Sequence, residues 1–358
     1  MPTNLDADEI PGAAPRLGHV IDDLLDEPDD QRDPPPKKKR RLRRALLVIA
    51  SVVVLVLAGV AGYVGYLSTK VDDIAREPLL PTQEDGQEGT TSEGTKLVSG
   101  RGTNYLVIGS DARPGESASR ADVIQLVHVP ADSSGVYLVH FPRDLYVPIP
   151  GKGEDKINAA YAYGGAPLLV RTIQDLVGVK VDHVAKTDFE GFKQMTDAVG
   201  GVRVYAEEAS GSSGNGEVAI TKGWNDLDGE QALGFVRERY QLSEGDISRG
   251  QRQQAWMKAI MTKALSPGVL LNPVKFSSFV EAGTSNSVVD DTLTSKEIRD
   301  QALALRSIRG DDIHFITAPF SGYGTSPGGA SIDVLDEEGM AELGDALKAD
   351  EMDTYEAR

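Results

Sequence analysis

Residues 104–111 read NYLVIGSD, and after the loop ARPGESASR and one alanine, residues 122–129 read DVIQLVHV. The first stretch is a short apolar run that ends in glycine, serine and aspartate, which is typical of a buried strand entering a turn. The second stretch and GVYLV at 135–139 predict two further strands. Because helical and strand patterns alternate after this point, we expect an α/β domain with a central sheet and helices on both faces.

The remaining elements follow from apolar spacing and cap residues. Helices are expected at 165–177, 189–199, about 228–236, 247–265, 295–306 and 336–348, and strands at 181–187, 201–204 and 313–317. The helix near 228 has Asp228 as its N-cap and Gln231 three residues later, which is a capping-box pattern. Met257 and Met261 are spaced i,i+4 in the longest of these helices, so they predict one packed face.

Composition excludes several classes of protein. The chain has 358 residues, 40% of them hydrophobic, a formal net charge of −18 and no cysteine. This apolar content is too high for a wholly disordered chain, and the absence of cysteine excludes a disulfide scaffold, thiolate chemistry and a cysteine zinc site. Beyond Leu67 the chain has 45 acidic and 28 basic residues, so we expect no nucleic-acid partner, which would need a basic surface.

An uncharged stretch near the N-terminus predicts a membrane anchor. Ala45 to Leu67 carry no charge and, as a helix, would span about 34 Å, enough to cross a bilayer core. The preceding block KKKRRLRR, residues 37–44, places the N-terminus in the cytoplasm and the rest outside, by the positive-inside rule. A cleaved signal peptide and a buried core helix are the alternatives; the apolar stretch is too long for the first and lacks a clear cleavage site.

Two aspartates lie at the ends of adjacent predicted strands. Asp111 follows the first strand and Asp122 begins the second, so their carboxylates could share one hard cation. Mg²⁺ suits this position, because it prefers oxygen ligands and usually takes one or two carboxylates alongside substrate phosphates. The alternative is a pair of surface aspartates that cap turns.

Arginines cluster in two parts of this acidic chain. Arg113, Arg120 and Arg143 lie around the strand edge, and a second group follows in RERYQLSEGDISRGQRQQ, at Arg237, Arg239, Arg249 and Arg252. The planar guanidinium suits phosphate oxygens and stays charged when desolvated. The alternative is a set of solvated helix faces, with Arg239 paired to Glu244 or Asp246.

Spacing sharpens the phosphate hypothesis. Arg237 and Arg239 would point apart on a helix but to the same side of an extended segment, so a shared phosphate requires the helix to end near Val236. Arg249 and Gln253 are i,i+4 on the next predicted helix, with Asp246 one turn earlier, so these three share a face.

Seven stretches in order carry a resemblance to a known family: NYLVIGSDAR, SRADVIQLVHV, HFPRDLYVPIP, KINAAYAYGG, DAVGGVRV, LDGEQALGFVRERY and DISRGQRQQ. They resemble the LytR-CpsA-Psr (LCP) family of bacterial cell-wall glycopolymer ligases. The resemblance covers core motifs at 103–265 and a closing portion at 270–350. It implies a three-layer α-β-α sandwich around a central mixed sheet. Phe141 departs from the family pattern, which has a small residue before the PRD motif.

The resemblance also implies an activity and its partners. Such enzymes are phosphotransferases: they move the sugar-phosphate of a glycopolymer from a polyprenyl-pyrophosphate lipid to a peptidoglycan hydroxyl and release polyprenyl phosphate. Magnesium, or manganese in its place, would be the cofactor, and the protein would be a single-pass protein of the cell membrane with an extracytoplasmic catalytic domain.

The family's site residues can be carried over position by position. Asp111 and Asp122 match the acidic pair linked to the metal and to catalysis, and either could accept the proton of the attacking hydroxyl. The residues that match pyrophosphate binding are Arg120, Arg143, Lys156, Arg237, Arg239, Arg249 and Gln253, of which Arg143, Arg237 and Arg239 are also expected to be catalytic. Asp144, Asn158 and Asp246 are expected to orient these groups.

These inferences divide the chain into four parts. Residues 1–44 form a disordered cytoplasmic tail that ends in the basic block, residues 45–67 a transmembrane helix, residues 68–100 a linker and residues 101–350 the LCP catalytic domain.

Two other functions remain open at this stage. The outer domain could sense lipid pyrophosphates for a membrane-bound regulator, a role suggested by the label of transcriptional attenuator given to family members. It could also hydrolyse the pyrophosphate with water as the acceptor. The sequence lacks HExxH, GxSxG, Walker A and GxGxxG motifs, so zinc-protease, serine-hydrolase, P-loop and Rossmann functions lack their markers. Which glycopolymer is transferred does not follow from the sequence.

Overall fold

The structure, a computed structural model, describes residues 37–81, 91, 96–110, 121–211, 218–238, 240–243 and 246–356, with backbone only at 37–48, 50, 60, 246 and 247. The chain forms two compact units, Met1–Gly59 and Val60–Arg358. The predicted tail therefore lies outside the described residues, except for its basic block.

Helix α1 (Lys37–Asp72) contains the predicted transmembrane stretch and extends beyond it at both ends. Within the described residues, its segment Ser51–Asp72 is the one helix long and apolar enough to cross a membrane, with a mean hydropathy of 1.9. Its side chains from Val52 to Leu57 are exposed, as expected of a helix that packs against lipid rather than protein.

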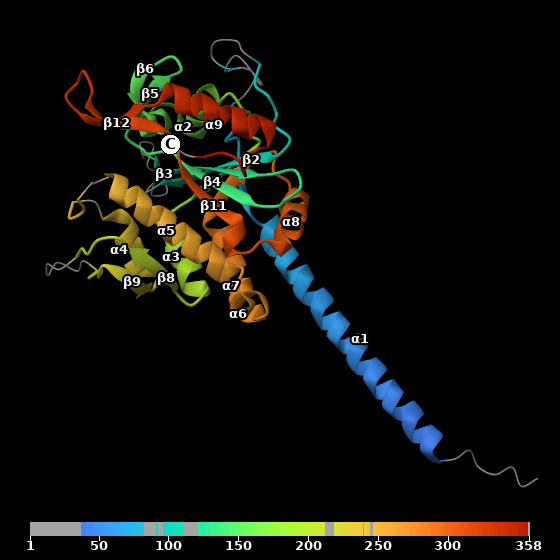
Figure 1. Ribbon diagram of the computed structural model, residues 1–358. Helices are drawn as coiled ribbons and strands as arrows, with labels where there is room; N and C mark the ends of the chain where they lie inside the picture. Colours follow the sequence, from blue (N-terminus) through green and yellow to red (C-terminus); the bar gives the residue numbers. More distant parts are fainter. Residues whose placement is uncertain are drawn as a thin grey trace, which may run out of the picture. The chain divides into compact units, whose positions relative to one another are not determined.

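A seven-stranded mixed sheet forms the centre of the second unit (Figure 1). Its strands, in spatial order, are β1 (Ala75–Glu77), β10 (Ser287–Asp290), β7 (His183–Thr187), β2 (Thr103–Ser110), β3 (Ala121–Val129), β4 (Val136–His140) and β11 (Ile313–Thr317). The three strands predicted first lie side by side at β2, β3 and β4, and these pairs are antiparallel. Pairs β1–β10, β2–β7 and β4–β11 are parallel, so the sheet is mixed.

Two smaller sheets flank the central one. One contains β12 (Phe320–Thr325), β13 (Ser331–Leu335), β5 (Leu145–Ile149) and β6 (Gly153–Lys156), and the other is the hairpin of β8 (Val202–Ala206) and β9 (Gly223–Leu227). Of these strands, sequence reasoning predicted β8 alone. Strand β13 pairs in parallel with β5, although their paired residues Asp333 and Leu145 lie far apart in the chain.

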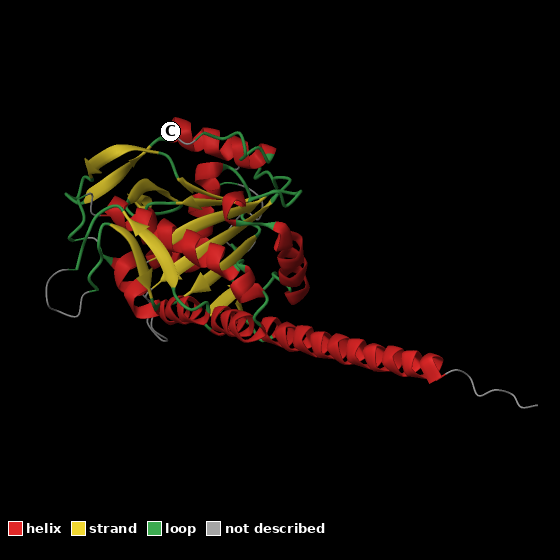
Figure 2. Ribbon diagram, turned by 60° about the horizontal axis from the view of Figure 1, so that its bottom comes forward, coloured by secondary structure: helices red, strands yellow, loops and turns green. Residues whose placement is uncertain are grey.

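Helices cover both faces of the central sheet, which confirms the predicted three-layer α-β-α sandwich (Figure 2). One layer contains α2 (Ile157–Val177) and α9 (Glu337–Ala349), and the other contains α3 (Phe189–Ala198), α4 (Gly229–Arg237) and α5 (Asp246–Ala264). The chain continues from α5 through α6 (Pro267–Leu270), α7 (Pro273–Ser285), α8 (Ser295–Ala304) and the short 3₁₀ turns η3 (Leu305–Ser307) and η4 (Gly310–Asp312).

Strand alternation explains why both faces are covered. Along β2, Leu106 and Ile108 are fully buried in the core beneath α2 and α9, whereas Val107 faces the opposite layer. Phe141, the departure from the family pattern, is also fully buried in the α2–α9 core. Burial of each such side chain contributes about 1.5–3 kcal/mol to stability.

Helix α2 begins earlier than predicted. The apolar pattern predicted residues 165–177, but the helix starts at Ile157 and is interrupted at Gly164 and Gly165. Gly165 has φ +64°, a conformation that favours glycine, and Pro167 follows it. The predicted start therefore corresponds to this break, because glycine and proline mask the helical turn before them.

Helix α5 packs very closely against the end of β4. A Cβ atom built on Gly250 would lie 3.0 Å from Nε2 of His140, so glycine is needed for this approach. His140 is buried, and its Nδ1 has no hydrogen-bond partner among the described residues. Burial, with the nearby Arg249 charge, lowers the pKa of His140 to about 4, so the ring is neutral in the folded protein at pH 7.

This buried histidine predicts a loss of stability in acid. An unfolded histidine titrates near 6.5, so stability is fully present above that pH and falls as the pH drops from about 6.5 toward 4, by about 2 kcal/mol at pH 5 for this group. We expect the free energy of unfolding to fall less between pH 7 and pH 5 in His140→Gln than in the unsubstituted chain. Denaturant titrations followed by tryptophan fluorescence at both pH values measure the difference; equal losses in the two proteins would contradict it.

Candidate functional site

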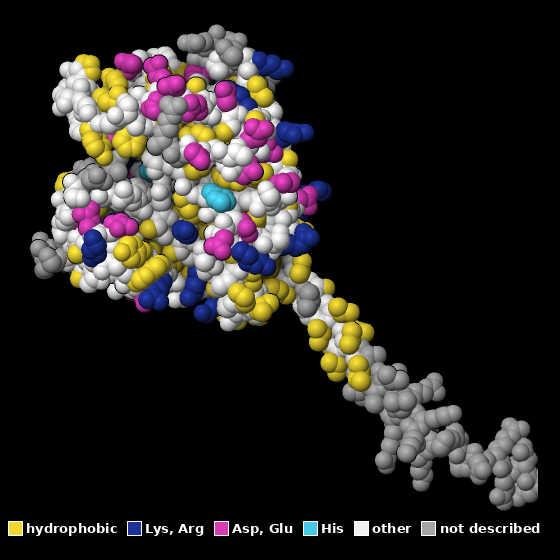
Figure 3. All heavy atoms as spheres, viewed as in Figure 1, with side chains coloured by type: hydrophobic (Ala, Val, Ile, Leu, Met, Phe, Trp, Pro, Cys, Tyr) yellow, Lys and Arg dark blue, Asp and Glu magenta, His cyan; other side chains and the backbone are white. Residues whose placement is uncertain are grey.

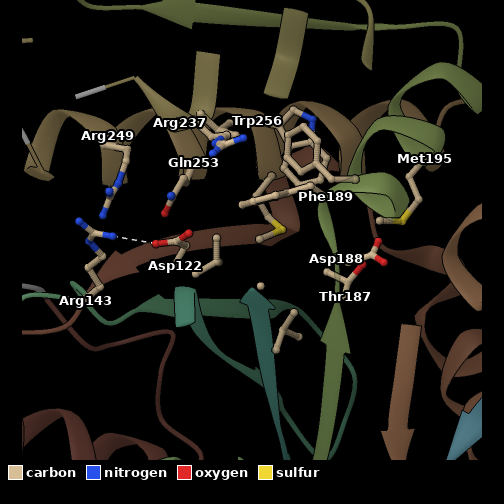
Figure 4. A pocket seen from close by; sticks show the side chains of 16 residues that line it. Asp122, Arg143, Thr187, Asp188, Phe189, Met195, Arg237, Arg249, Gln253 and Trp256 are labelled. Atoms are coloured by element: carbon tan, nitrogen blue, oxygen red, sulfur yellow. Dashed lines mark hydrogen bonds and ion pairs between the residues drawn. The ribbon is translucent and has the colours of Figure 1, made fainter. Parts of the chain in front are cut away.

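A cavity of about 310 Å³ lies between the central sheet and the layer of α3, α4 and α5 (Figure 4). Its floor is formed by side chains and backbone at the ends of β2 and β3, and its roof by the three helices. The residues that line it are Val107, Gly109, Asp122, Val123, Arg143, Thr187, Asp188, Phe189, Phe192, Met195, Val236, Arg237, Arg249, Gln253, Trp256 and Met257.

The charged end of the cavity is built around an ion pair. Asp122 lies next to the β-bulge at which the register of β2 and β3 shifts, between Gly109 and Ser110. Its Oδ1 atom accepts a hydrogen bond from NH1 of Arg143 at 2.7 Å. Both side chains remain partly accessible from the cavity, with 25% of Asp122 and 16% of Arg143 exposed, so a ligand can reach them.

A network behind Arg143 holds it in place. Lys156 Nζ donates to Asp144 Oδ1 at 2.8 Å, and the other carboxylate oxygen of Asp144 lies 4.0 Å from Nε of Arg143. The backbone N–H of Asn158 donates to the carbonyl of Arg143 at 3.3 Å. Asp144 and Asn158 therefore lie where a supporting role was predicted, whereas Lys156 contacts Asp144 and does not line the cavity.

Arg237 reaches the cavity because α4 ends there. The capping box between Asp228 and Gln231 fixes the start of α4, as predicted, and the helix ends at Arg237, with Glu238 extended. The sequence predicts that the helix ends near Val236 if Arg237 and Arg239 bind one phosphate, and the observed end at Arg237 agrees with this. The guanidinium carbon of Arg237 lies 4.7 Å from the ring centroid of Phe189, a cation–π contact that orients it.

Helix α5 supplies the roof of the charged end. Arg249 and Gln253, spaced i,i+4, are both buried and line the cavity, as expected from their shared face. Arg252 does not join them: its guanidinium donates to Ser210 Oγ at 2.8 Å and to the carbonyl of Glu208 at 3.0 Å. Burial lowers the pKa of Arg252 below its ordinary value, but these contacts make it a structural residue.

The opposite end of the cavity is mostly apolar, although Thr187 and Asp188, the N-cap of α3, also border it. Phe189, Phe192 and Met195 project from α3, and Trp256 and Met257 project from α5. The rings of Phe192 and Trp256 stack at 3.8 Å between centroids, and Nε1 of Trp256 donates to Thr196 Oγ1 at 3.1 Å. Figure 4 shows Arg143, Arg249 and Asp122 at one end and Met195 at the other, so the cavity is amphiphilic.

Sequence reasoning missed the α3 side chains of this wall. The signal that could have found them is the spacing of Phe189, Phe192 and Met195 at i, i+3 and i+6, which marks one apolar helix face. That spacing predicts that this face of α3 is buried, but it does not predict that the face borders a cavity. Met257, which the sequence predicts to lie on a packed helix face, borders the cavity.

Several predicted site residues lie outside the described part of the chain. These are Asp111, Arg113, Arg120 and Arg239, together with the side chain of Asp246. Their roles therefore stay predictions. The described residues bring Asp122, Arg143, Arg237, Arg249 and Gln253 around one cavity from four separate segments.

The donor set at the charged end is compatible with a divalent cation. Among the described residues, no group of three or more His, Asp or Glu side chains could hold a metal ion. Of the residues that the structure describes, Asp122 offers the carboxylate at the charged end, and Mg²⁺ needs only one or two carboxylates when phosphate oxygens complete its shell. Three guanidiniums in the same cavity suit the oxygens of such a phosphate ligand.

Comparison with known proteins places the chain among cell-wall proteins. It is 31% identical over 330 residues to the cell wall biosynthesis protein LcpA of Corynebacterium glutamicum, covering 79% of this chain but 62% of LcpA, so it spans less than two thirds of that relative. It is 28% identical to the polyisoprenyl-teichoic acid–peptidoglycan teichoic acid transferase TagU of Oceanobacillus iheyensis, covering 80% and 88% of the two chains.

This chain is also similar to a solved structure and to a protein-family model. The structure of TagT bound to LI-WTA superposes with a TM-score of 0.56 and 26% identity, over 74% of this chain and 99% of TagT. The model of the LytR_cpsA_psr family matches residues 80–349, three quarters of the chain, including the cavity described above. The chain therefore belongs to the LytR-CpsA-Psr family.

Proposed function

We propose that this protein is a phosphotransferase that moves the sugar-phosphate of a glycopolymer from a polyprenyl-pyrophosphate lipid to peptidoglycan and releases polyprenyl phosphate. The observation that carries the proposal is the amphiphilic cavity: Arg143 and Arg249 lie at one end, α3 forms an apolar wall toward the other, and Arg237 lies between them on the ring of Phe189. A lipid with a doubly phosphorylated head has this same division between charge and hydrocarbon. The name of TagU, a teichoic acid transferase, supports the same reaction class, and the name of LcpA supports a role in cell wall biosynthesis.

The cavity residues supply binding and electrostatic stabilisation. The acceptor hydroxyl attacks the phosphorus bonded to the sugar, a new P–O bond forms, and the bond to the bridging oxygen breaks, so that polyprenyl phosphate leaves. Charge increases on the bridging and non-bridging oxygens during this step, and fixed guanidiniums placed against them lower the barrier. Asp122 is the described carboxylate at this end, and we propose that it or Asp111 accepts the hydroxyl proton.

We propose Mg²⁺ as the cofactor, with Mn²⁺ as a substitute. Asp122, together with Asp111, would hold the ion, and the ion would neutralise phosphate charge. The support is the donor set: one carboxylate faces the cavity at the position where arginines converge.

The cellular placement is also a proposal. The candidate span Ser51–Asp72 fits a single-pass membrane protein. The basic block at residues 37–44 supports a cytoplasmic N-terminus, with the catalytic domain and its peptidoglycan acceptor outside.

Removal of a cavity arginine should strongly reduce transfer. We expect Arg143→Ala and Arg249→Ala each to lower kcat by about 10²–10³-fold, the range for loss of one preorganised donor to a developing oxyanion. The assay follows polyprenyl phosphate released from a polyprenyl-pyrophosphate sugar and glycan attached covalently to a peptidoglycan acceptor.

Arg203→Ala is the matched control for these variants. Arg203 lies on β8, is 65% exposed and is not part of the cavity, so its loss should leave kcat unchanged. Full release of polyprenyl phosphate by Arg143→Ala would reject the catalytic assignment. Release that continues without glycan on the acceptor would identify a pyrophosphatase, and binding without turnover would identify a sensor.

The metal requirement can be tested separately. We expect EDTA to abolish transfer and Mg²⁺ to restore it, and Asp122→Asn to raise the Mg²⁺ concentration needed for half-maximal rate. Because Asp122 also contacts Arg143, Arg143→Lys is the control: it should lower the rate without changing the Mg²⁺ dependence. The same Mg²⁺ dependence in Asp122→Asn and the unsubstituted chain would remove Asp122 from the metal site.

A further inference from the structure

An exposed apolar turn, formed by the end of α5, α6 and the start of α7, lies outside the lining of the cavity. Residues 264–274, ALSPGVLLNPV, carry no charge, and Lys263 and Lys275 flank them. Within the turn, Leu271 is 82% exposed, Val274 71% and Leu270 39%. Figure 3 shows hydrophobic side chains gathered at this part of the surface, where Figure 1 places α6. Such adjacent exposed side chains need a partner, because isolated apolar residues are common at surfaces but clusters are not.

Contacts between α7 and α1 show where this turn lies along α1, and that position indicates what the turn binds. The Tyr63 hydroxyl donates to the carbonyl of Pro273 at 2.9 Å, and Nζ of Lys70 lies 2.7 Å from Glu281 Oε1. The step from Tyr63 to Lys70 is about 10 Å along a helix and the step from Pro273 to Glu281 about 12 Å. Helix α7 therefore runs beside the last turns of α1 in the same direction, with its N-terminus level with Tyr63.

Tyr63 itself belongs to the apolar part of α1. Tyr63 lies one helical turn before Leu67, the last residue of the uncharged stretch, and within the candidate span Ser51–Asp72. Tyrosine is favoured at membrane interfaces, where its ring contacts hydrocarbon and its hydroxyl finds a polar partner. A turn level with Tyr63 therefore lies at the depth of the interface if α1 crosses a membrane.

We propose that the exposed side chains of residues 270–274 insert into the bilayer leaflet from which α1 emerges and form a second membrane contact, while Ala264 and Val269 stay in the protein core. Leu270, Leu271 and Val274 enter the boundary between headgroups and acyl chains, as the apolar faces of interfacial helices do. Lys263 lies at one end of the uncharged stretch 264–274, where its ammonium group can meet lipid phosphates. The Lys275 ammonium, at the other end, lies against Gly200.

A second contact of this kind would also place the cavity relative to the membrane. Helix α7 packs on α3: Nδ2 of Asn286, which ends α7, donates to Gln194 Oε1 at 2.9 Å, and a Cβ on Gly283 would lie 3.7 Å from the sulfur of Met195. Met195 lines the apolar end of the cavity. The helix held at the membrane is thus adjacent to the wall that we assign to the hydrocarbon chain.

The absence of cysteine makes the proposal directly testable in the full-length chain. Single variants Leu271→Cys and Val274→Cys are labelled with the polarity-sensitive fluorophore NBD and reconstituted into phosphatidylcholine–phosphatidylglycerol vesicles. Nitroxides are placed on the acyl chain either near the headgroup or near the bilayer centre. We expect blue-shifted emission at both positions and stronger quenching by the shallow nitroxide than by the deep one.

Two controls separate this inference from the anchor on which it rests. Leu57→Cys, in α1, should be quenched more by the deep nitroxide, and Tyr323→Cys, exposed on β12, by neither. If position 57 is quenched and positions 271 and 274 behave like 323, the second contact is rejected and the anchor stands. If the Leu57→Cys variant is not quenched, α1 does not cross the bilayer, and both the anchor and the second contact are rejected. Blue-shifted emission at 271 without lipid quenching would mean that protein covers the turn, which also rejects the proposal.

Discussion

The close packing of α5 on the end of β4 is the constraint on which the site depends. Gly250 allows the helix to approach the ring of His140 so closely that a Cβ at this position would lie 3.0 Å from Nε2. This approach holds Arg249 and Gln253, on either side of that contact along the helix, above the strand ends that carry Asp122 and Arg143. The neutral, buried histidine beneath α5 adds no charge to the charged end of the cavity, which is formed by the guanidiniums and the carboxylate of Asp122.

Arginine function in this chain depends on where each guanidinium finds its partners. Arg252 is satisfied by Ser210 and Glu208 and stabilises the fold, although it lies only three residues from Arg249. Arg143 is held by Asp122 and the neighbouring Asp144, yet keeps access to the cavity. Supporting carboxylates hold the guanidinium in place before ligand arrives, which reduces the reorganisation needed during reaction.

The helix layer of α3, α4 and α5 connects the cavity with α7 and the last turns of α1. Its member α3 forms the apolar cavity wall on one side and contacts α7 on the other, and α7 is linked to α1 through Tyr63 and Lys70. The proposed lipid substrate needs an apolar wall like that of α3, because exposing its hydrocarbon chain to water costs about 0.8 kcal/mol per CH₂ group.

The sequence by itself determined the apolar α1 stretch, the alternation that produces a three-layer α/β fold, and the strand and helix ends where Asp122, Arg143 and Arg237 lie. These features are local: periodicity, caps and turn residues specify them within a few turns of chain. Only the tertiary structure decided that Phe189, Phe192 and Met195 leave a cavity, that Arg252 turns away while Arg249 faces inward, and that β13 pairs with β5. Periodicity shows which face of a helix or strand is buried. The cavity, the direction in which Arg252 turns and the pairing of β13 with β5 all depend on contacts between segments that are distant in the chain. A local sequence pattern does not encode such contacts.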